Sequence, residues 1–139
     1  MNERKEFAER ICGRVAKVAW EQIVGTTGAD IVASWGIRGV GAGVVINESG
    51  YYLPCLVLAV SGLIHKGRVI VALNEGLDEY EVALWNKSGQ RVGRWHTGLM
   101  FDELGAKIDE LVERPKGMTD EDYMLLSMLD SDIKDITGE

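Results

Sequence analysis

Two cysteines and two histidines are the residues of this 139-residue chain that could supply a nucleophile and a general base. Cys12 lies in the middle of a helix-forming stretch, and Cys55 follows Pro54 in an apolar, strand-forming stretch. A cysteine becomes nucleophilic when a base or a helix amino terminus stabilises its thiolate, and neither stretch supplies one. We therefore expect both cysteines to pack as small hydrophobic side chains. We expect His65 to lie in solvent in a hairpin turn, and His96 is the other candidate base.

The same residue types could bind a metal ion, but their spacing does not suit a metal site. No pair has the Cys-x-x-Cys or His-x-x-x-His spacing that lets one element present two ligands. Asp78 and Glu79 are adjacent in a strand-forming stretch, where neighbouring side chains point to opposite faces, so we do not expect them to form a carboxylate pair. We expect no catalytic residue, no metal and no cofactor, and a Cys/His enzyme is kept as an alternative.

A glycine-rich segment, 36–43, invites a phosphate-binding interpretation because glycine lets a backbone approach a ligand closely. A dinucleotide-binding loop needs its glycines to open a helix, and a P-loop ends in Gly-Lys followed by Ser or Thr. Here Gly43 is followed by the β-branched run 44–46, which favours a strand. We expect a bulged strand or a mobile loop, with small-molecule binding as the alternative.

Proteins that bind single-stranded nucleic acid combine aromatic side chains with arginine side chains on one surface. The residues of this kind in the chain are Trp35, Tyr80, Trp85 and Trp95, joined by Arg68, Arg91 and Arg94. Acidic residues at 75, 78, 79 and 81 balance the arginines, so the sequence shows no basic groove. We expect core packing or a protein contact for the aromatic residues, and we do not expect nucleic acid as a partner.

The elements that would position these residues begin with an amphipathic helix over 1–24. Its apolar residues recur at steps of mostly three and four, with charged residues largely between them. They are Phe7, Ile11, Val15, Val18 and Ile23. The run Gly25-Thr-Thr-Gly28 then supplies the glycine that favours the carboxyl end of a helix.

Residues 30–96 predict an antiparallel sheet, because β-branched and aromatic residues there are interrupted by glycines. Two Asn-x-x-Gly runs, 47–50 and 86–89, predict tight hairpin turns that a left-handed glycine closes. The predicted strands are 31–37, 42–46, 52–62, 68–73, 79–85 and 90–96. Strand 52–62 is apolar on both faces, which predicts cover on both sides, whereas 79–85 alternates and predicts one less buried face.

Two helices are predicted after the sheet, over 101–113 and 119–135. The second is apolar over much of its circumference, and its apolar residues repeat at steps of three and four, the spacing of a helix-packing seam. The candidate partner-binding residues on it are Tyr123, Leu126, Leu129 and Ile133. Such a surface must be covered by its own sheet, by a second copy of the chain or by another protein.

The net charge of −7 is concentrated near the carboxyl end. Residues 101–139 contain four basic and twelve acidic residues, whereas the first 100 residues are close to neutral. A surplus of this sign disfavours binding to a polyanion. It also allows an alternative function, in which the acidic tail mimics DNA and inhibits a basic nucleic-acid-binding protein.

Three stretches between 67 and 113 carry a resemblance to known sequences. They are Arg68-Val-Ile-Val-Ala-Leu-Asn-Glu-Gly76, Tyr80-Glu-Val and Ile108-Asp-Glu-Leu-Val112. This run of about a third of the chain resembles short uncharacterised accessory proteins of phages and integrative elements of gut bacteria. The resemblance implies a bacterial cytoplasmic setting and an accessory role on a mobile element, and it brings no catalytic residue with it.

The composition and length of the chain indicate one globular domain. With 46% hydrophobic and 27% charged residues the chain is typical of globular domains, and no stretch is long and apolar enough to span a membrane. We predict one cytoplasmic α+β domain over 1–139: an N-terminal helix, an antiparallel meander of five to six strands and two C-terminal helices. Its predicted function is that of a non-enzymatic accessory protein that forms a homodimer or binds a protein partner.

Overall fold

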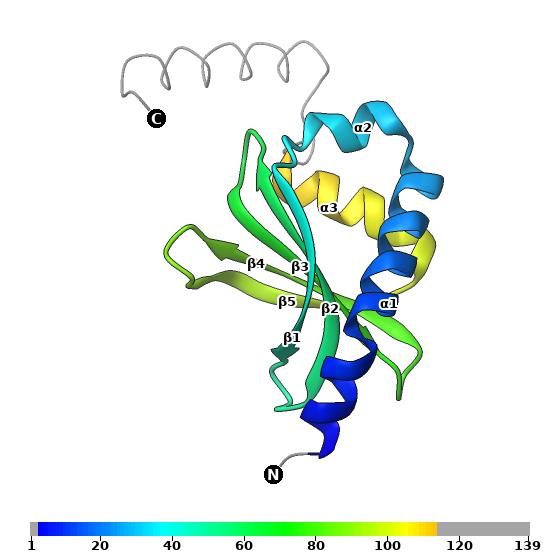
Figure 1. Ribbon diagram of the computed structural model, residues 1–139. Helices are drawn as coiled ribbons and strands as arrows, with labels where there is room; N and C mark the ends of the chain where they lie inside the picture. The colour runs from blue at the N-terminus through cyan, green and yellow to red at the C-terminus, as the bar shows by residue number, and fades with distance from the viewer. Residues whose placement is uncertain (1–2, 114–139) are drawn as a thin grey trace.

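The computed structural model describes residues 3–113, and Figure 1 shows how their helices and strands are arranged. The elements in chain order are α1 (Glu3–Thr27), α2 (Ala29–Ser34), β1 (Gly39–Ile46), β2 (Tyr52–Ser61), β3 (Lys66–Asn74), β4 (Glu79–Asn86), β5 (Arg91–Leu99), the 3-10 turn η1 (Phe101–Glu103) and α3 (Leu104–Val112). All five strands form one antiparallel sheet in the order β1-β2-β3-β4-β5, so each strand pairs with its neighbour in sequence. The predicted α+β fold is confirmed.

The three helices lie on one face of the sheet (Figure 1) and build the main core with it. α1 packs chiefly on β2 and β1, and α3 packs against α1. Leu56 and Leu58 of β2 point at the helices, and both are 0% exposed. Trp35, directly after α2, is fully buried as well and donates its indole N–H to the Asp109 carboxylate at 3.0 Å. Buried side chains from the helices complete this core: Ala19, Ile23, Val32, Leu104, Ile108 and Val112.

The first helix is longer than predicted, and the predicted apolar stripe is confirmed in part, since Ile11, Val15 and Ile23 are buried. α1 continues to Thr27 and ends at Gly28, whose φ of +99° is the left-handed conformation that favours glycine at a helix end. Phe7 and Val18 of the predicted apolar stripe remain exposed. The buried face includes small residues instead, which let the helix lie close to the sheet: Ala8, Ala16 and Ala19.

The opposite face of the sheet carries a second, smaller core, so the predicted cover on both sides of β2 is confirmed. Buried there are Leu53, Cys55, Ile70, Ala72, Ala83 and Trp95. Trp85 packs against the edge of Trp95, with ring centroids 5.7 Å apart and an interplanar angle of 80°. Edge-to-face pairing of this kind adds to the stabilisation that burial alone gives.

Glu81 shows how the chain closes over this second core. Its carboxylate is 4% exposed and accepts hydrogen bonds from the side-chain amides of Asn47 at 3.2 Å and Asn74 at 2.9 Å. Asn47 belongs to the β1–β2 turn, and Glu48 of the same turn pairs with Arg91 at 3.4 Å. The predicted less buried face of β4 is therefore confirmed only at Trp85, which is half-buried, and is wrong at Glu81 and Ala83, which are buried.

Both Asn-x-x-Gly turns are confirmed and share one geometry. The carbonyl of Asn47 accepts the N–H of Gly50 at 3.0 Å, and the carbonyl of Asn86 accepts the N–H of Gly89 at 3.1 Å. The two glycines have φ values of +83° and +82°, which a side chain would disfavour. Each asparagine side chain also accepts the backbone N–H four residues further on, at 2.9 Å in both turns.

The prediction of a strand over 31–37 is wrong, since this segment forms α2 and a short connection. Its β-branched residues favour strands, but the helical turn lets both Val32 and Trp35 enter the main core. Gly36 then approaches β2 so closely that a Cβ atom would lie 2.6 Å from the Ser61 carbonyl oxygen. The backbone N–H of Ser61 donates to the carbonyl oxygens of Trp35 and Gly36, at 3.0 and 3.1 Å, which fixes the path into β1.

η1 and α3 occupy the helical range predicted over 101–113. The predicted helix over 119–135, together with Tyr123, Leu126, Leu129 and Ile133, lies outside the described residues. None of the helices between residues 3 and 113 is long and apolar enough to cross a membrane.

Candidate functional site

Neither cysteine lies in surroundings that would make it nucleophilic. Cys55 is 1% exposed, and its burial, helped by the nearby Cys12 thiol, raises its pKa to about 12. The thiol therefore stays protonated at neutral pH. Cys12 is half-buried on α1, where its thiol donates to the Glu9 carbonyl at 3.3 Å. In the described part of the chain both cysteines are free thiols.

The expectation that His65 lies in solvent is wrong. His65 is in the predicted connection between β2 and β3, but it is only 7% exposed, and its Nε2 lies 3.3 Å from the Arg68 carbonyl oxygen. Its backbone N–H donates to the carbonyl of Val112 at 3.2 Å, so the end of α3 packs on this connection and covers it. A histidine held between backbone groups stabilises the connection and is not open to a substrate.

His96 of β5 is half-buried, and three effects lower its pKa below the usual value of 6.5. The largest is desolvation, and the positive charges of Lys107 and Arg94 add to it, while Glu110 acts in the opposite direction. The folded protein therefore favours the neutral imidazole.

A pH titration of stability should show this effect. Below pH 6.5 the unfolded chain takes up a proton on His96 that the folded protein resists, so this contribution is complete above pH 6.5 and is lost as the pH falls toward the lower folded-state pKa. We expect His96→Gln to lose less stability than the native protein between about pH 7.5 and about pH 5.5. Urea unfolding at both pH values measures it, and equal losses in the two proteins would contradict the assignment.

The glycine-rich segment 36–43 forms no phosphate-binding loop. β1 pairs with β2 residue by residue from Gly39 to Ile46 without a bulge, so the predicted bulged strand or mobile loop is wrong. The segment runs from the connection after α2 directly into a regular strand. Its glycines therefore belong to the edge of the sheet, since β1 is the first strand in the order.

The carboxylates do not gather into a metal site in the region that the structure describes. Asp78 lies in the β3–β4 turn with a φ of +52°, and Glu79 opens β4. Within residues 3–113 no group of three His, Cys, Asp or Glu side chains is arranged to hold a metal ion. Glu81 is engaged by two asparagine amides, which gives it a structural role.

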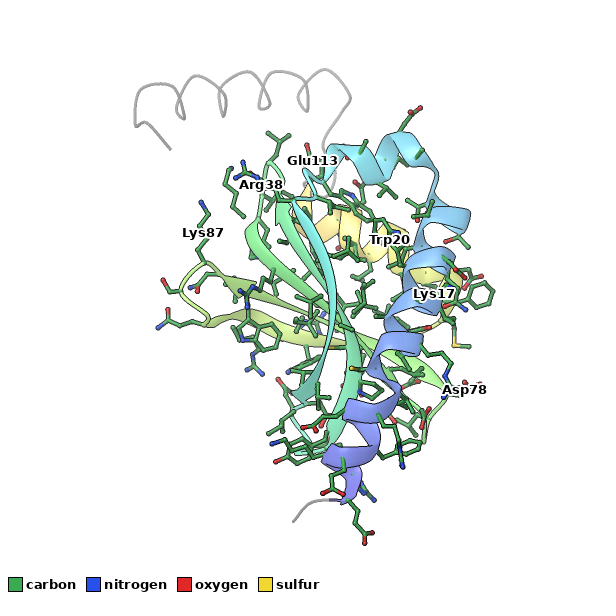
Figure 2. All side chains as sticks on the ribbon, viewed as in Figure 1. Lys17, Trp20, Arg38, Asp78, Lys87 and Glu113 are labelled. Carbon is green, nitrogen blue, oxygen red and sulfur yellow. The ribbon has the colours of Figure 1, made fainter. Side chains whose placement is uncertain are left out.

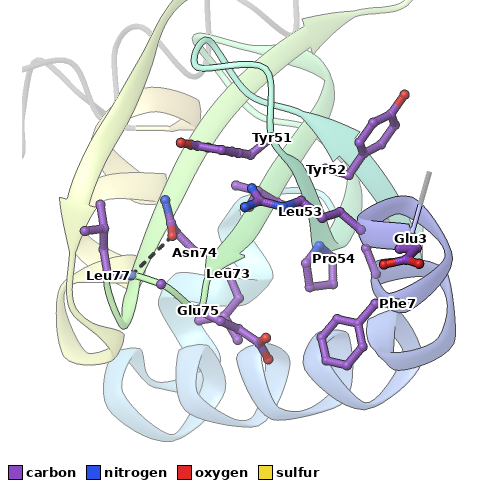
Figure 3. A pocket seen from close by; sticks show the side chains of 13 residues that line it. Glu3, Phe7, Tyr51, Tyr52, Leu53, Pro54, Leu73, Asn74, Glu75 and Leu77 are labelled. Atoms are coloured by element: carbon purple, nitrogen blue, oxygen red, sulfur yellow. Dashed lines mark hydrogen bonds between the residues drawn. The ribbon is translucent and has the colours of Figure 1, made fainter.

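A groove of about 680 Å³ opens on the described surface, and no sequence pattern predicted it. Figure 3 shows three sides of it: Phe7 from α1, Tyr51 from the β1–β2 turn and Leu77 from the β3–β4 turn. These side chains are 43%, 46% and 65% exposed, and together they leave apolar surface open at one place. The Arg4 guanidinium lies 5.0 Å from the centre of the Tyr51 ring. The groove therefore presents a partly aromatic lining to a ligand or a partner side chain, with Arg4 stacked on one of its rings.

The two edges of the sheet differ in a way that bears on function. β5 carries Arg91, Arg94 and His96, and its pairing with β4 contains register shifts. Charges and bulges of this kind keep an edge strand from pairing with another chain. β1, from Gly39 to Ile46, has neither, and it contains no proline. The described part of the chain therefore has one protected edge and one open edge.

The aromatic residues do not form one stacking surface. Trp35 and Tyr80 lie in the main core, and Trp95 lies in the second core with Trp85 packed beside it. This confirms the core packing that we expected. However, the prediction that acidic residues balance the arginines is wrong for Arg68. Arg68 lies opposite Trp85 near one end of β3 and β4, whereas the acidic residues at 75, 78 and 79 lie at the other end. The basic end thus has no acidic neighbours from this turn.

No protein-family model, no curated protein and no solved structure matches this chain. The geometry of the described residues therefore carries the functional argument.

Proposed function

We propose that this protein is a non-enzymatic accessory protein of the cytoplasm that works through protein contacts, and that it forms a homodimer through the β1 edge. The observation that carries the proposal is the contrast between the two edges within residues 3–113: β5 is charged and bulged, whereas β1 is regular and uncharged and has no described strand on its outer side. An edge strand of this kind is a template for pairing with another chain.

A second copy of β1 suits this edge better than a charged partner strand would. Two β1 strands that pair antiparallel about a two-fold axis bring no like charges together, since Gly39–Ile46 contains no charged residue. Each backbone hydrogen bond across the edge adds about 0.5–1.5 kcal/mol. Val40 and Ile46 are 51% and 52% exposed, and pairing would remove part of that apolar surface from water.

The resemblance to accessory proteins of phages and integrative elements supports the same class of function. Such a protein would act by binding to a partner protein, and a dimer provides two equivalent binding surfaces. The groove lined by Phe7, Tyr51 and Leu77 is a second surface through which each copy could bind a protein side chain.

A charge on the open edge should dissociate the dimer. We expect full-length protein to have the mass of two chains by light scattering, and Val40→Lys to have the mass of one, because a lysine on an edge strand disfavours pairing with another chain. Val92→Lys is the matched control: Val92 is 41% exposed on the protected edge, and the same change there should leave the mass unchanged. A monomeric native protein, or an unchanged dimer of Val40→Lys, would refute the β1 interface.

The helix-packing seam predicted over 119–135 is a competing candidate for the dimer interface. Truncation after Lys116 removes Tyr123, Leu126, Leu129 and Ile133, and leaves the described elements in place. If β1 carries the dimer, the truncated protein keeps the mass of two chains. A fall to one chain, with Val40→Lys still dimeric, would assign the interface to the tail instead.

A further inference from the structure

A hollow of about 240 Å³ opens at the basic end of the sheet, and three cationic side chains line it. Arg38 precedes β1, Arg68 belongs to β3, and Lys87 lies in the β4–β5 turn, so the cations come from three separate segments. Figure 2 labels Arg38 and Lys87, which extend from the sheet on the same side of the molecule. Backbone and small side chains form the rest of the lining: Ala59, Val60, Ser61 and Gly67.

The three cations lack the partners that arginine and lysine usually have. In the described part of the chain, none of them forms an ion pair, and none donates a side-chain hydrogen bond. No acidic residue lines the hollow, although the chain contains 22 acidic residues. Like charges that share one hollow repel each other, and a bound anion would relieve that repulsion.

The backbone around the hollow is held by the sheet. The N–H of Arg38 donates to the Ala59 carbonyl at 2.8 Å, and Arg68 is the cross-strand neighbour of Ala59 on the other side. Gly67 also lines the hollow, with its backbone alone. The Ser61 hydroxyl is half-buried at the rim and is an additional donor. The site thus presents two guanidinium groups, one ammonium group and one hydroxyl from a rigid frame.

We infer that this hollow binds the phosphate group of a small anion. Guanidinium groups match the geometry of phosphate oxygens and bind them with paired hydrogen bonds. The volume of about 240 Å³ is below the range of about 300–1,000 Å³ that holds a whole drug-sized molecule, so it suits an anionic head group. The net charge of −7 disfavours a long polyanion, which favours a small ligand over nucleic acid.

Calorimetric titration of the full chain with pyrophosphate tests the site. We expect binding to the native protein, and we expect Arg68→Gln to bind about ten-fold more weakly or worse, because a charge-assisted hydrogen bond is lost. Arg94→Gln is the matched control: it removes the same charge from an exposed position of β5 that does not line the hollow. Its affinity should stay within about two-fold of native. Circular dichroism of both variants confirms that they are folded.

The inference would be overturned if native protein did not bind pyrophosphate at about 0.15 M salt. Equal weakening by Arg68→Gln and Arg94→Gln would overturn it as well, because it would indicate a diffuse charge effect. A nucleoside diphosphate used as a second probe separates two sources of the phosphate. Equal affinities for both probes would indicate that the site recognises the phosphate groups alone. Tighter binding of the nucleotide would indicate that the site also contacts the nucleoside. A single-stranded oligonucleotide that binds more tightly than either probe would contradict the assignment to a small anion.

Discussion

Leu58→Asp is expected to leave the protein unfolded at room temperature. Leu58 is 0% exposed and lies at the middle of β2, where it faces the helices from within the main core. An ionised carboxylate there would have no partner, and burying it would cost several kcal/mol. The whole stability of a domain of this size is about 5–15 kcal/mol, so one such change removes most of it.

Thermal melting followed by circular dichroism measures this effect, with Leu77→Asp as the matched control. Leu77 is 65% exposed in the β3–β4 turn, so the same substitution there should shift the melting temperature by a few degrees at most. A cooperative transition of Leu58→Asp near the native temperature would show that the main core does not depend on β2.

Gly67→Ala is expected to destabilise the fold by about 2–5 kcal/mol, as much as a large core mutation. Gly67 has a φ of +155°, and a Cβ atom at this position would overlap the Trp85 carbonyl oxygen of the neighbouring strand. Because the obstacle is backbone inside a sheet, no side-chain rotation can relieve it. Urea unfolding would measure the loss as a lower midpoint.

Gly41→Ala separates this steric effect from the general effect of removing a glycine. Gly41 lies in β1, and a Cβ atom added there would meet no heavy atom within 4 Å, so alanine should be neutral or stabilising. If both variants lose the same stability, the close approach of β3 to β4 at Gly67 is not the cause.

Local patterns predicted the parts of the fold that depend on local interactions. The turns at Asn47 and Asn86 are closed by their own side chains and by glycines, so the sequence is sufficient to place them. The doubly buried strand β2 was likewise recognisable, because both of its faces are apolar. Such signals lie within a few residues of each other along the chain.

Features that depend on tertiary contacts could not be predicted from local sequence patterns. Glu81 alternates with apolar residues and indicates an exposed face, yet its carboxylate is buried and accepts hydrogen bonds from Asn74, across the β3–β4 turn, and from Asn47, which is distant in sequence. The α2 segment forms a helix because Val32 and Trp35 fit the core, against the preference of its β-branched residues. Tertiary packing overrides local preference in both cases.

The candidate sites were harder to predict than the fold. The open edge had one signal in the sequence, the absence of charge between Gly39 and Ile46, but its meaning depends on β1 being the first strand of the sheet. Arg68 was singled out only together with the aromatic residues, and Arg38 and Lys87 carried no signal, since the three are far apart in the chain and only the fold brings them to one hollow.

Amide hydrogen exchange of residues 39–46 tests most directly whether the outer edge of β1 pairs with a second copy of the chain. Exchange is measured at two protein concentrations about a hundred-fold apart, for native protein and for Val40→Lys. We predict slower exchange of this segment in concentrated native protein and no such slowing in the variant. Exchange that is independent of concentration in native protein would contradict pairing at this edge.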